Sequence, residues 1–167
     1  MKRFLILLLC LSLLLPIFGC SQQEKAPEKP VNYYYRRASI DYKNESGVIG
    51  AEQRESLGHE GQVRYLLSEY LKGPKSSEFS QIFPADLTIL SIHYADTRAK
   101  ITFSFQLAQL TGIDLTIACA CITMTVIELT GAESVQIFAA GALLDEYQSI
   151  TMDKNCLLLL DESAQGK

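Results

Sequence analysis

The stretch that decides the fold is LTGIDLTIACACITMTVIELTGAE, residues 110–133. Its threonine, isoleucine and valine residues favour a strand by propensity, whereas roughly 20 residues without a breaker after Gly112 favour a helix. If the segment is a helix, one apolar face is formed by Leu115, Cys119, Ile122, Val126 and Leu129. Gly131 then supplies a helix stop. We therefore predict a helix buried on a sheet.

The same stretch is too short to cross a membrane. It is bounded by Asp114 and Glu128, about 13 residues apart, whereas a span needs about 20 apolar residues. The chain has 167 residues, of which 48% are hydrophobic and 20% charged. This length and composition suit one folded domain with its own core, and the stretch is expected to lie in that core.

A β-hairpin is predicted directly before this helix, in LTILSIHYADTRAKITFSFQL, residues 87–107. Apolar and polar residues alternate on both sides of an ADTR turn. The apolar face is expected to carry Leu90, Ile92, Tyr94, Ala99, Ile101, Phe103 and Phe105, with Lys100 on the polar face. A helical layer should therefore cover only one side of the sheet. Two closing strands are predicted after the helix, in SVQIFAAG (134–141) and CLLLLD (156–161).

A second helix is predicted in EGQVRYLLSEYLKGP, residues 60–74. One apolar stripe repeats at helical spacing, formed by Val63, Leu66, Leu67, Tyr70 and Leu71. Gly73 and Pro74 should end the helix. Before it, VNYYYRRASI (31–40) is predicted as an edge strand, and residues 41–59 as a polar loop with room for a short strand.

The N-terminus predicts export. Lys2 and Arg3 precede an uncharged run of 15 residues, Phe4 to Phe18. A retained anchor helix is the alternative, but the run is short for a span and contains Pro16, which favours a signal peptide.

The stretch IFGC that closes this run resembles the bacterial lipobox, in which a diacylglyceryl group is added to the cysteine before cleavage. The resemblance implies a signal peptide at 1–19 and a lipid on Cys20, followed by a flexible tether at 20–30. The folded domain is then expected at 31–162 and a frayed tail at 163–167.

Charge and chemistry exclude several classes of function. The formal charge is −4 and becomes −6 without Lys2 and Arg3, so we expect no nucleic-acid partner. The CAC at Cys119 and Cys121 has neither zinc nor redox spacing and lies in apolar sequence, which predicts buried, inert thiols. His59 and His93 belong to no ligand or catalytic motif. We predict no catalytic residue, no metal and no cofactor.

Taken in order, several segments resemble the GerMN-type domain of sporulation and spore-germination lipoproteins. They are YLLSEYLKGP, Phe83-Pro84, AKITFSF, IACACITMTVIEL and SVQIFAAG, and together they cover about Val31 to Asp161. The resemblance implies an α+β domain, a small mixed sheet with two helices on one face. It also implies kinship in architecture with ring-building domains, which pack side by side through helix-to-sheet contacts.

Two classes of function follow as expectations. The first is a non-catalytic assembly module of a lipid-anchored protein on the extracytoplasmic face of the membrane, with a protein partner or self-assembly. The second is a lipoprotein that binds a small ligand or a cell-wall fragment. An exposed apolar patch would favour the first class, and a deep pocket the second. Tyr33, Tyr35 and Arg37 are the predicted interaction surface, because Tyr and Arg are enriched where proteins meet.

Overall fold

A computed structural model describes residues 30–39, 47–56, 58–59, 61–141 and 149–155. Residues 1–29, which include Cys20, the tether up to residue 29 and the signal segment, lie outside this description. In chain order the elements are β1 (Pro30–Arg37), β2 (Ile49–Glu55), α2 (Val63–Leu71), β3 (Phe79–Ser80), β4 (Ile89–Ala95), β5 (Arg98–Phe103), the 3-10 helix η2 (Phe105–Gln109), α3 (Gly112–Thr130), β6 (Ser134–Ala139) and β7 (Ser149–Asp153).

The strands form two sheets, so the predicted α+β class is confirmed while the single expected sheet becomes two. One sheet has the order β2-β1-β3 and is antiparallel throughout. The other has the order β4-β5-β6-β7, in which only β5 and β6 run parallel. The prediction that β1 is an edge strand was wrong, because it lies between β2 and β3. β2 is the short strand for which the predicted polar loop at residues 41–59 left room.

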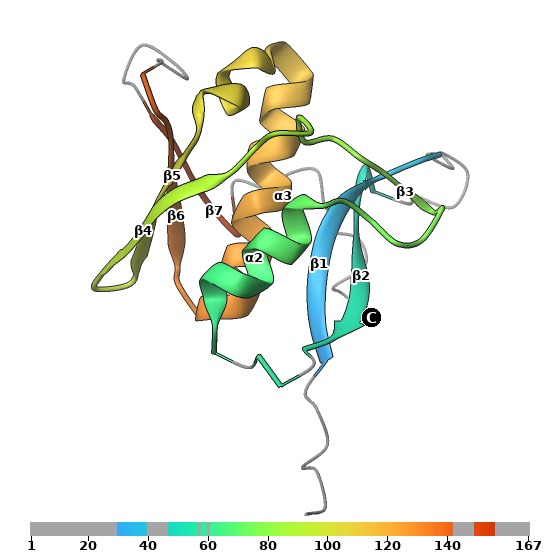
Figure 1. Ribbon diagram of the computed structural model, residues 1–167, viewed down its shortest axis with the longest axis horizontal. Coiled ribbons are helices and arrows are strands. Elements are labelled where there is room, and N and C mark those ends of the chain that lie inside the picture. The colour runs from blue at the N-terminus through green and yellow to red at the C-terminus, as the bar shows by residue number, and fades with distance from the viewer. Residues whose placement is uncertain (1–29, 40–46, 57, 60, 142–148, 156–167) are drawn as a thin grey trace, which may run out of the picture.

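Helix α3 lies between the two sheets, with β1 on one side and β6 and β7 on the other (Figure 1). The predicted helix is confirmed, and its setting explains its composition. Nine of its residues are buried, almost consecutively: Ile117, Ala118, Cys119, Ala120, Cys121, Ile122, Thr123, Thr125 and Val126. A helix that is apolar all round must be covered all round. The expectation that this stretch is too short to cross a membrane was wrong, because α3 is long and apolar enough by length and composition alone, but its burial is that of a core helix.

Both helices end as the sequence predicts. The amide of Gly131 donates to the Ile127 carbonyl at 2.8 Å, with Gly131 at a left-handed φ of 71°. In α2 the buried residues are Leu66, Leu67, Tyr70 and Leu71, which confirms the stripe. The amide of Gly73, at φ 100°, donates to the Tyr70 carbonyl at 3.1 Å and closes that helix.

The β4–β5 hairpin is confirmed, but part of its predicted apolar face is not buried. Ala99, Ile101 and Phe103 on β5 are at most 1% exposed. On β4, a bulge between Ile89 and Ser91 turns Ile89 inward instead of Leu90. Leu90 is therefore 50% exposed. Tyr94 lies on the predicted face, opposite Ala99, but is 55% exposed. Phe105 lies beyond β5 in η2 and is 53% exposed, so its expected place on the hairpin face was wrong.

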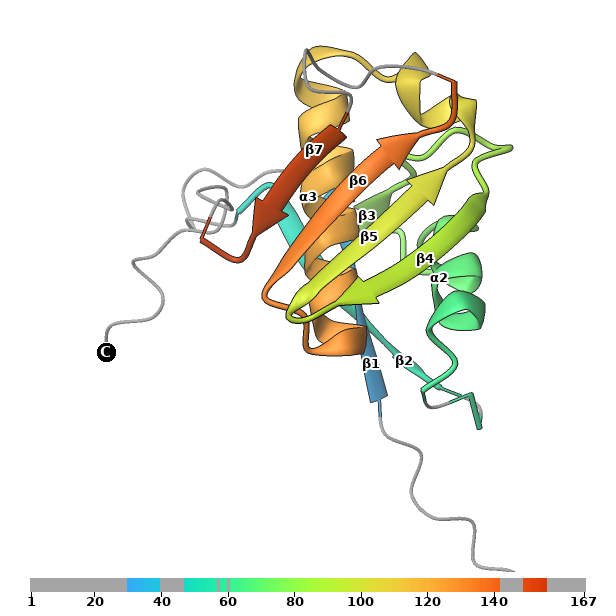
Figure 2. The same cartoon turned by 90° about the vertical axis from the view of Figure 1, so that its left-hand side faces the viewer.

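The closing strands are partly as predicted. β6 lies within 134–141, parallel to β5 across the α3 connection. β7 pairs antiparallel with β6 and was not predicted. The segment predicted as the last strand, residues 156–161, lies outside the described residues. Figure 2 shows α3 behind the four-stranded sheet, whose other face carries no helix from the described part of the chain.

Candidate interaction surface

Two of the three predicted surface residues lie in the core. Tyr33 and Tyr35 are 3% and 0% exposed. Their rings pack on Tyr70 of α2, with centroids 5.6 and 4.9 Å apart. The hydroxyl of Tyr35 donates to the Tyr70 carbonyl at 2.7 Å. The expectation of exposed aromatic side chains is corrected here, because β1 is covered by α2 and its alternate side chains fill that contact.

Backbone hydrogen-bonding groups of β1 are also paired with side chains of α2 and α3. At Tyr34 the strand has β2 on one side only, since β3 pairs just with Arg36 and Arg37. The free side of Tyr34 is bonded to side chains instead. Its amide donates to Thr125 Oγ1 at 3.0 Å, and its carbonyl accepts from the Tyr70 hydroxyl at 2.8 Å. Buried backbone groups require such partners, so α2 and α3 substitute here for a neighbouring strand.

A polar cluster fixes the loop after α2. The guanidinium of Arg54 contacts the Glu52 carboxylate at 2.5 Å and the Gly73 carbonyl at 2.8 Å. The same carboxylate accepts the backbone amides of Lys75 and Ser76, at 3.0 and 3.2 Å. Burial raises the pKa of Glu52, but these hydrogen bonds outweigh it and hold the pKa below its ordinary value. The cluster ties β2 to the α2–β3 loop and leaves little of either charge exposed.

Arg37, the third predicted surface residue, is half-buried at the end of β1. Its guanidinium lies over Gly50, where an added Cβ would come 2.9 Å from Arg37 Cζ and 2.9 Å from the Phe79 ring. Arg37 therefore packs along the sheet, and its charge does not gather with exposed aromatic side chains.

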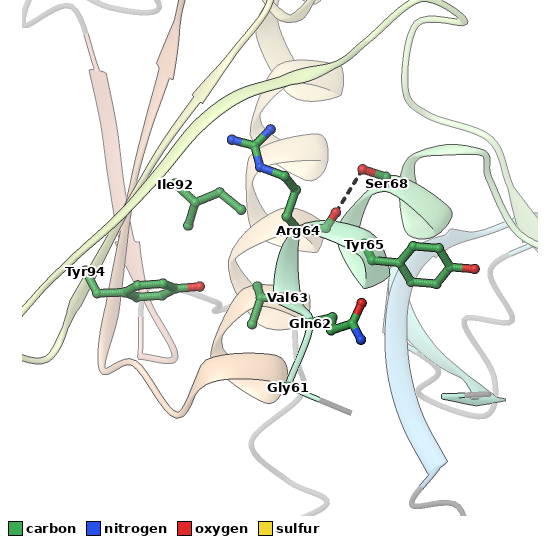
Figure 3. A pocket seen from close by; sticks show the side chains of 8 residues that line it. All are labelled: Gly61, Gln62, Val63, Arg64, Tyr65, Ser68, Ile92 and Tyr94. Atoms are coloured by element: carbon green, nitrogen blue, oxygen red, sulfur yellow. Dashed lines mark hydrogen bonds between the residues drawn. The ribbon is translucent and has the colours of Figure 1, made fainter. Parts of the chain in front are cut away.

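Two of the exposed large apolar side chains, Tyr65 and Tyr94, lie elsewhere, at a groove between α2 and β4. The groove has a volume of about 700 Å³ and is lined by Gly61, Gln62, Val63, Arg64, Tyr65, Ser68, Ile92 and Tyr94. Figure 3 shows Val63 and Arg64 on the α2 side and Ile92 and Tyr94 on the β4 side. Tyr65 and Tyr94 are 40% and 55% exposed. This α2–β4 groove is the candidate interaction surface.

Arg64 closes one end of the α2–β4 groove. Its guanidinium donates to the carbonyls of Ile89 and Leu90, at 2.9 and 3.1 Å. These carbonyls lie at the start of β4, where the bulge interrupts the ladder. Edge strands are commonly protected by such charged side chains and bulges. The protection here covers the beginning of β4 and leaves its hairpin end open.

The two cysteine thiols of α3 and the His59 imidazole are not placed to act as nucleophiles or bases. Cys119 and Cys121 are fully buried free thiols, as the sequence predicted. Burial raises the pKa of Cys119 to about 12 and raises that of Cys121 as well, so both are protonated at neutral pH. His59 contacts Gln62 Oε1 at 3.1 Å and stacks on Tyr65. Within the described residues, no three His, Cys, Asp or Glu side chains gather as metal ligands.

The sequence did not single out the α2–β4 groove. Ile92 and Tyr94 alternate with polar residues as core residues do, and Val63 belongs to the helix stripe. Alternation shows which face of a strand is apolar, but not how far the covering helix extends over it. The outermost position of β4 in its sheet, which leaves that face partly uncovered, follows only from the tertiary pairing.

Comparisons with known proteins identify the family of this chain and solved structures with a similar fold. The sequence matches the Germane family, described as sporulation and spore germination, over residues 32–145. No curated protein matches. The first GerMN domain of the sporulation protein GerM from Bacillus subtilis superposes with a TM-score of 0.52 at 21% identity, over 68% of this chain and 84% of that chain.

Two further solved structures are similar. The tandem GerMN domains of the same GerM protein give a TM-score of 0.53 at 18% identity, over 75% of this chain and 44% of that chain. A candidate lipoprotein from Clostridium perfringens gives 0.48 at 18% identity, over 77% of this chain and 89% of that chain. The GerM matches show the same fold.

Proposed function

Because this chain belongs to the Germane family of sporulation and spore germination, we propose that its folded domain is a non-catalytic interaction module. The module would serve a sporulation or germination assembly. In this proposal a lipid on Cys20 holds it at the extracytoplasmic face of the cell membrane. The tether between Cys20 and Pro30 reaches at most about 35 Å when extended, so the module would work close to the membrane. Tethering raises the effective concentration of a partner confined there.

The observation that carries the proposal is the exposure of large apolar side chains around the α2–β4 groove. Tyr94 on β4 and Tyr65 on α2 both line this groove and are 55% and 40% exposed. Contiguous exposed apolar surface is typical of protein contacts, and tyrosine is enriched in them. The groove replaces the surface that the sequence placed on β1.

Binding of a small ligand is the second candidate, supported by the volume of the α2–β4 groove and by the Arg64 guanidinium in its lining. Small-molecule sites usually enclose most of their ligand. This groove lies open between a helix and a strand (Figure 3). Its shape therefore supports a protein segment better than a small molecule.

A non-catalytic role is supported by how the reactive groups are held. The thiols in α3 are buried and protonated, and burial likewise raises the pKa values of Tyr35 and Tyr70. A protonated, buried group is a poor nucleophile or base at neutral pH. These side chains instead make the packing and hydrogen bonds described above.

In-cell crosslinking of the full-length, membrane-bound protein tests the proposal. Cells would be treated with an amine-reactive crosslinker during growth and during sporulation, and the protein recovered with its adducts. We expect a defined adduct with a protein of the envelope. Recovery of the uncrosslinked monomer alone, under both conditions, would reject the interaction function and favour the ligand-binding candidate.

A further inference from the structure

We propose that strand β4 accepts an extended segment of a partner protein as an added strand, and that this segment alternates apolar with acidic side chains. The inference rests on the proposed interaction function and specifies its binding mode. Strand addition to an exposed sheet edge takes its affinity from main-chain hydrogen bonds and its specificity from alternate side chains. Each of these requirements can be examined on β4.

The backbone of β4 offers unpaired groups on its outer side. Ala95 and Arg98 flank the two-residue turn at Asp96 and Thr97 and therefore form a hydrogen-bonded pair. Pairs alternate along an antiparallel ladder, so Tyr94 and Ile92 occupy the non-hydrogen-bonded positions. Their amides and carbonyls point away from β5. In the described part of the chain no hydrogen bond reaches these four groups.

Some outward backbone groups of the strands are satisfied. The outward amide and carbonyl of Tyr34 on β1 are bonded to Thr125 and Tyr70. At the start of β4 the carbonyls of Ile89 and Leu90 are bonded to Arg64. Along β4, the open groups of Ile92 and Tyr94 therefore lie together at the hairpin end, directly beside the α2–β4 groove.

The inner side of an added strand would face apolar surface. Ile92 and Tyr94 share the face of β4 that carries Ala99 and Ile101 on β5, and both line the α2–β4 groove. Val63 and Tyr65 line it from α2. An added strand lies about 4.8 Å from β4, so its inward side chains would enter the groove. Apolar side chains suit this lining.

The outer side of an added strand would face positive charge carried by β5. Lys100 and Arg98 lie on this face of β5, and Lys100 is the cross-strand partner of His93 on β4. Both cations are exposed, and neither forms an ion pair within the described residues. The chain as a whole is acidic, at −4, so this local positive charge stands out. Carboxylates on alternate residues of the partner would complement it.

A second copy complements this charge less well. In a pairing of β4 with β4 of another copy, the incoming strand would carry Ser91 and His93 on this face and no carboxylate. An acidic segment would place carboxylates next to the basic side chains of β5, so the partner of different chemistry is the favoured occupant.

The binding test uses the detergent-solubilised full-length chain and a labelled peptide of about eight residues that alternates valine and glutamate. We expect saturable binding, weakened at least about tenfold when lysine replaces glutamate. Methylation of the amides on one edge should abolish it, because those amides would supply the main-chain hydrogen bonds. Equal binding of the methylated peptide, or no binding of the parent peptide, would overturn the proposal.

Variants locate the site. Tyr94→Pro removes the ring and the outward amide, whereas Tyr94→Ala removes the ring alone, and we expect proline to bind about 2- to 10-fold more weakly than alanine. Lys100→Glu should shift preference toward the lysine peptide. Thr151→Glu, on the same face two strands further along, is the matched control and should change nothing. If Tyr94→Pro unfolds, the Lys100→Glu and Thr151→Glu pair decides.

The outcome separates this inference from the proposed function. A photo-crosslinker at Ser91 of the full-length protein should capture the same partner that amine crosslinking finds in cells. Capture of a second copy at Ser91 would overturn the acidic-segment inference. Capture of the partner through another surface, with nothing at Ser91, would also overturn it while leaving the interaction function standing.

Discussion

Tyr70→Phe tests whether the helices substitute for a missing strand beside β1. The change removes one hydroxyl from a residue that is fully buried and keeps the ring that packs on Tyr33 and Tyr35. The hydroxyl donates to the Tyr34 carbonyl at 2.8 Å. Without it that carbonyl loses its donor in a site that α2 and α3 cover.

The expected loss follows from that one contact. Leaving a buried polar group without its partner costs about 1–3 kcal/mol, and the ring contributes nothing to the change. Urea denaturation of a soluble form that begins at Ser21 would measure it as a fall in midpoint on the order of 1 M, with an unchanged slope. Tyr65→Phe is the matched control, because it lies on the same helix with a 40% exposed side chain, and it should stay within about 0.5 kcal/mol.

A second change tests the reasoning further. Thr125→Val removes the acceptor of the Tyr34 amide and should also cost about 1–3 kcal/mol. Because both changes act on the same residue of β1, their combined effect should depart from the sum of the two. Tyr70→Phe and Tyr65→Phe with equal midpoints would refute the idea that Tyr34 depends on the helices.

The remaining predictions address the anchor, the core and acid stability. Cys20→Ala should block both lipidation and cleavage of the signal segment, which intact-mass measurement would detect; a variant processed and held in the membrane like the parent would contradict the lipoprotein proposal. Leu67→Ala, at 1% exposure, should cost about 2–5 kcal/mol, and Lys100→Ala within about 0.5 kcal/mol, as urea midpoints would show. The lowered pKa of Glu52 means its contribution is complete above the ordinary glutamate value, about 4.3, and is lost as pH falls through the folded value. Glu52→Gln should therefore flatten the fall in stability as the pH drops below about 4.3, and an unchanged pH profile would argue against that role.

Much of the fold could be predicted from local pattern. The stripe from Val63 to Leu71 and its glycine stop identify α2, and the length of the run up to Gly131 identifies α3 despite its strand-forming residues. Tertiary burial explains why length prevailed: a helix covered by two sheets needs apolar residues on every side. Two of the threonines bond to backbone, Thr125 at Tyr34 and Thr130 at Val126, whereas the buried hydroxyl of Thr123 has no partner among the described residues.

The interaction surface could not be predicted in the same way. Tyr33 and Tyr35 have the composition of an interface, but Tyr70 of α2 packs on both rings and Phe79 and Phe83 pack on Tyr35. Leu90 and Tyr94 have the alternation of a core strand, but a bulge and the edge position expose them. In both cases burial depends on which elements meet in space, and pairing between distant segments leaves little trace in a single sequence.

The attachment of β1 to α3 has a mechanical consequence. Asn32, Tyr34 and Arg36 alternate along β1 and bond to Glu128, Thr125 and Asp114, which run in the opposite order along α3. A lipid on Cys20 would transmit tension to the beginning of this strand, at Pro30, while a partner held at β4 would pull on the other sheet. The load would then pass along β1 and through all three contacts to α3 at once, in shear. Contacts loaded together resist more force than contacts that peel apart singly, so the domain would hold its fold while it links a membrane to an assembly.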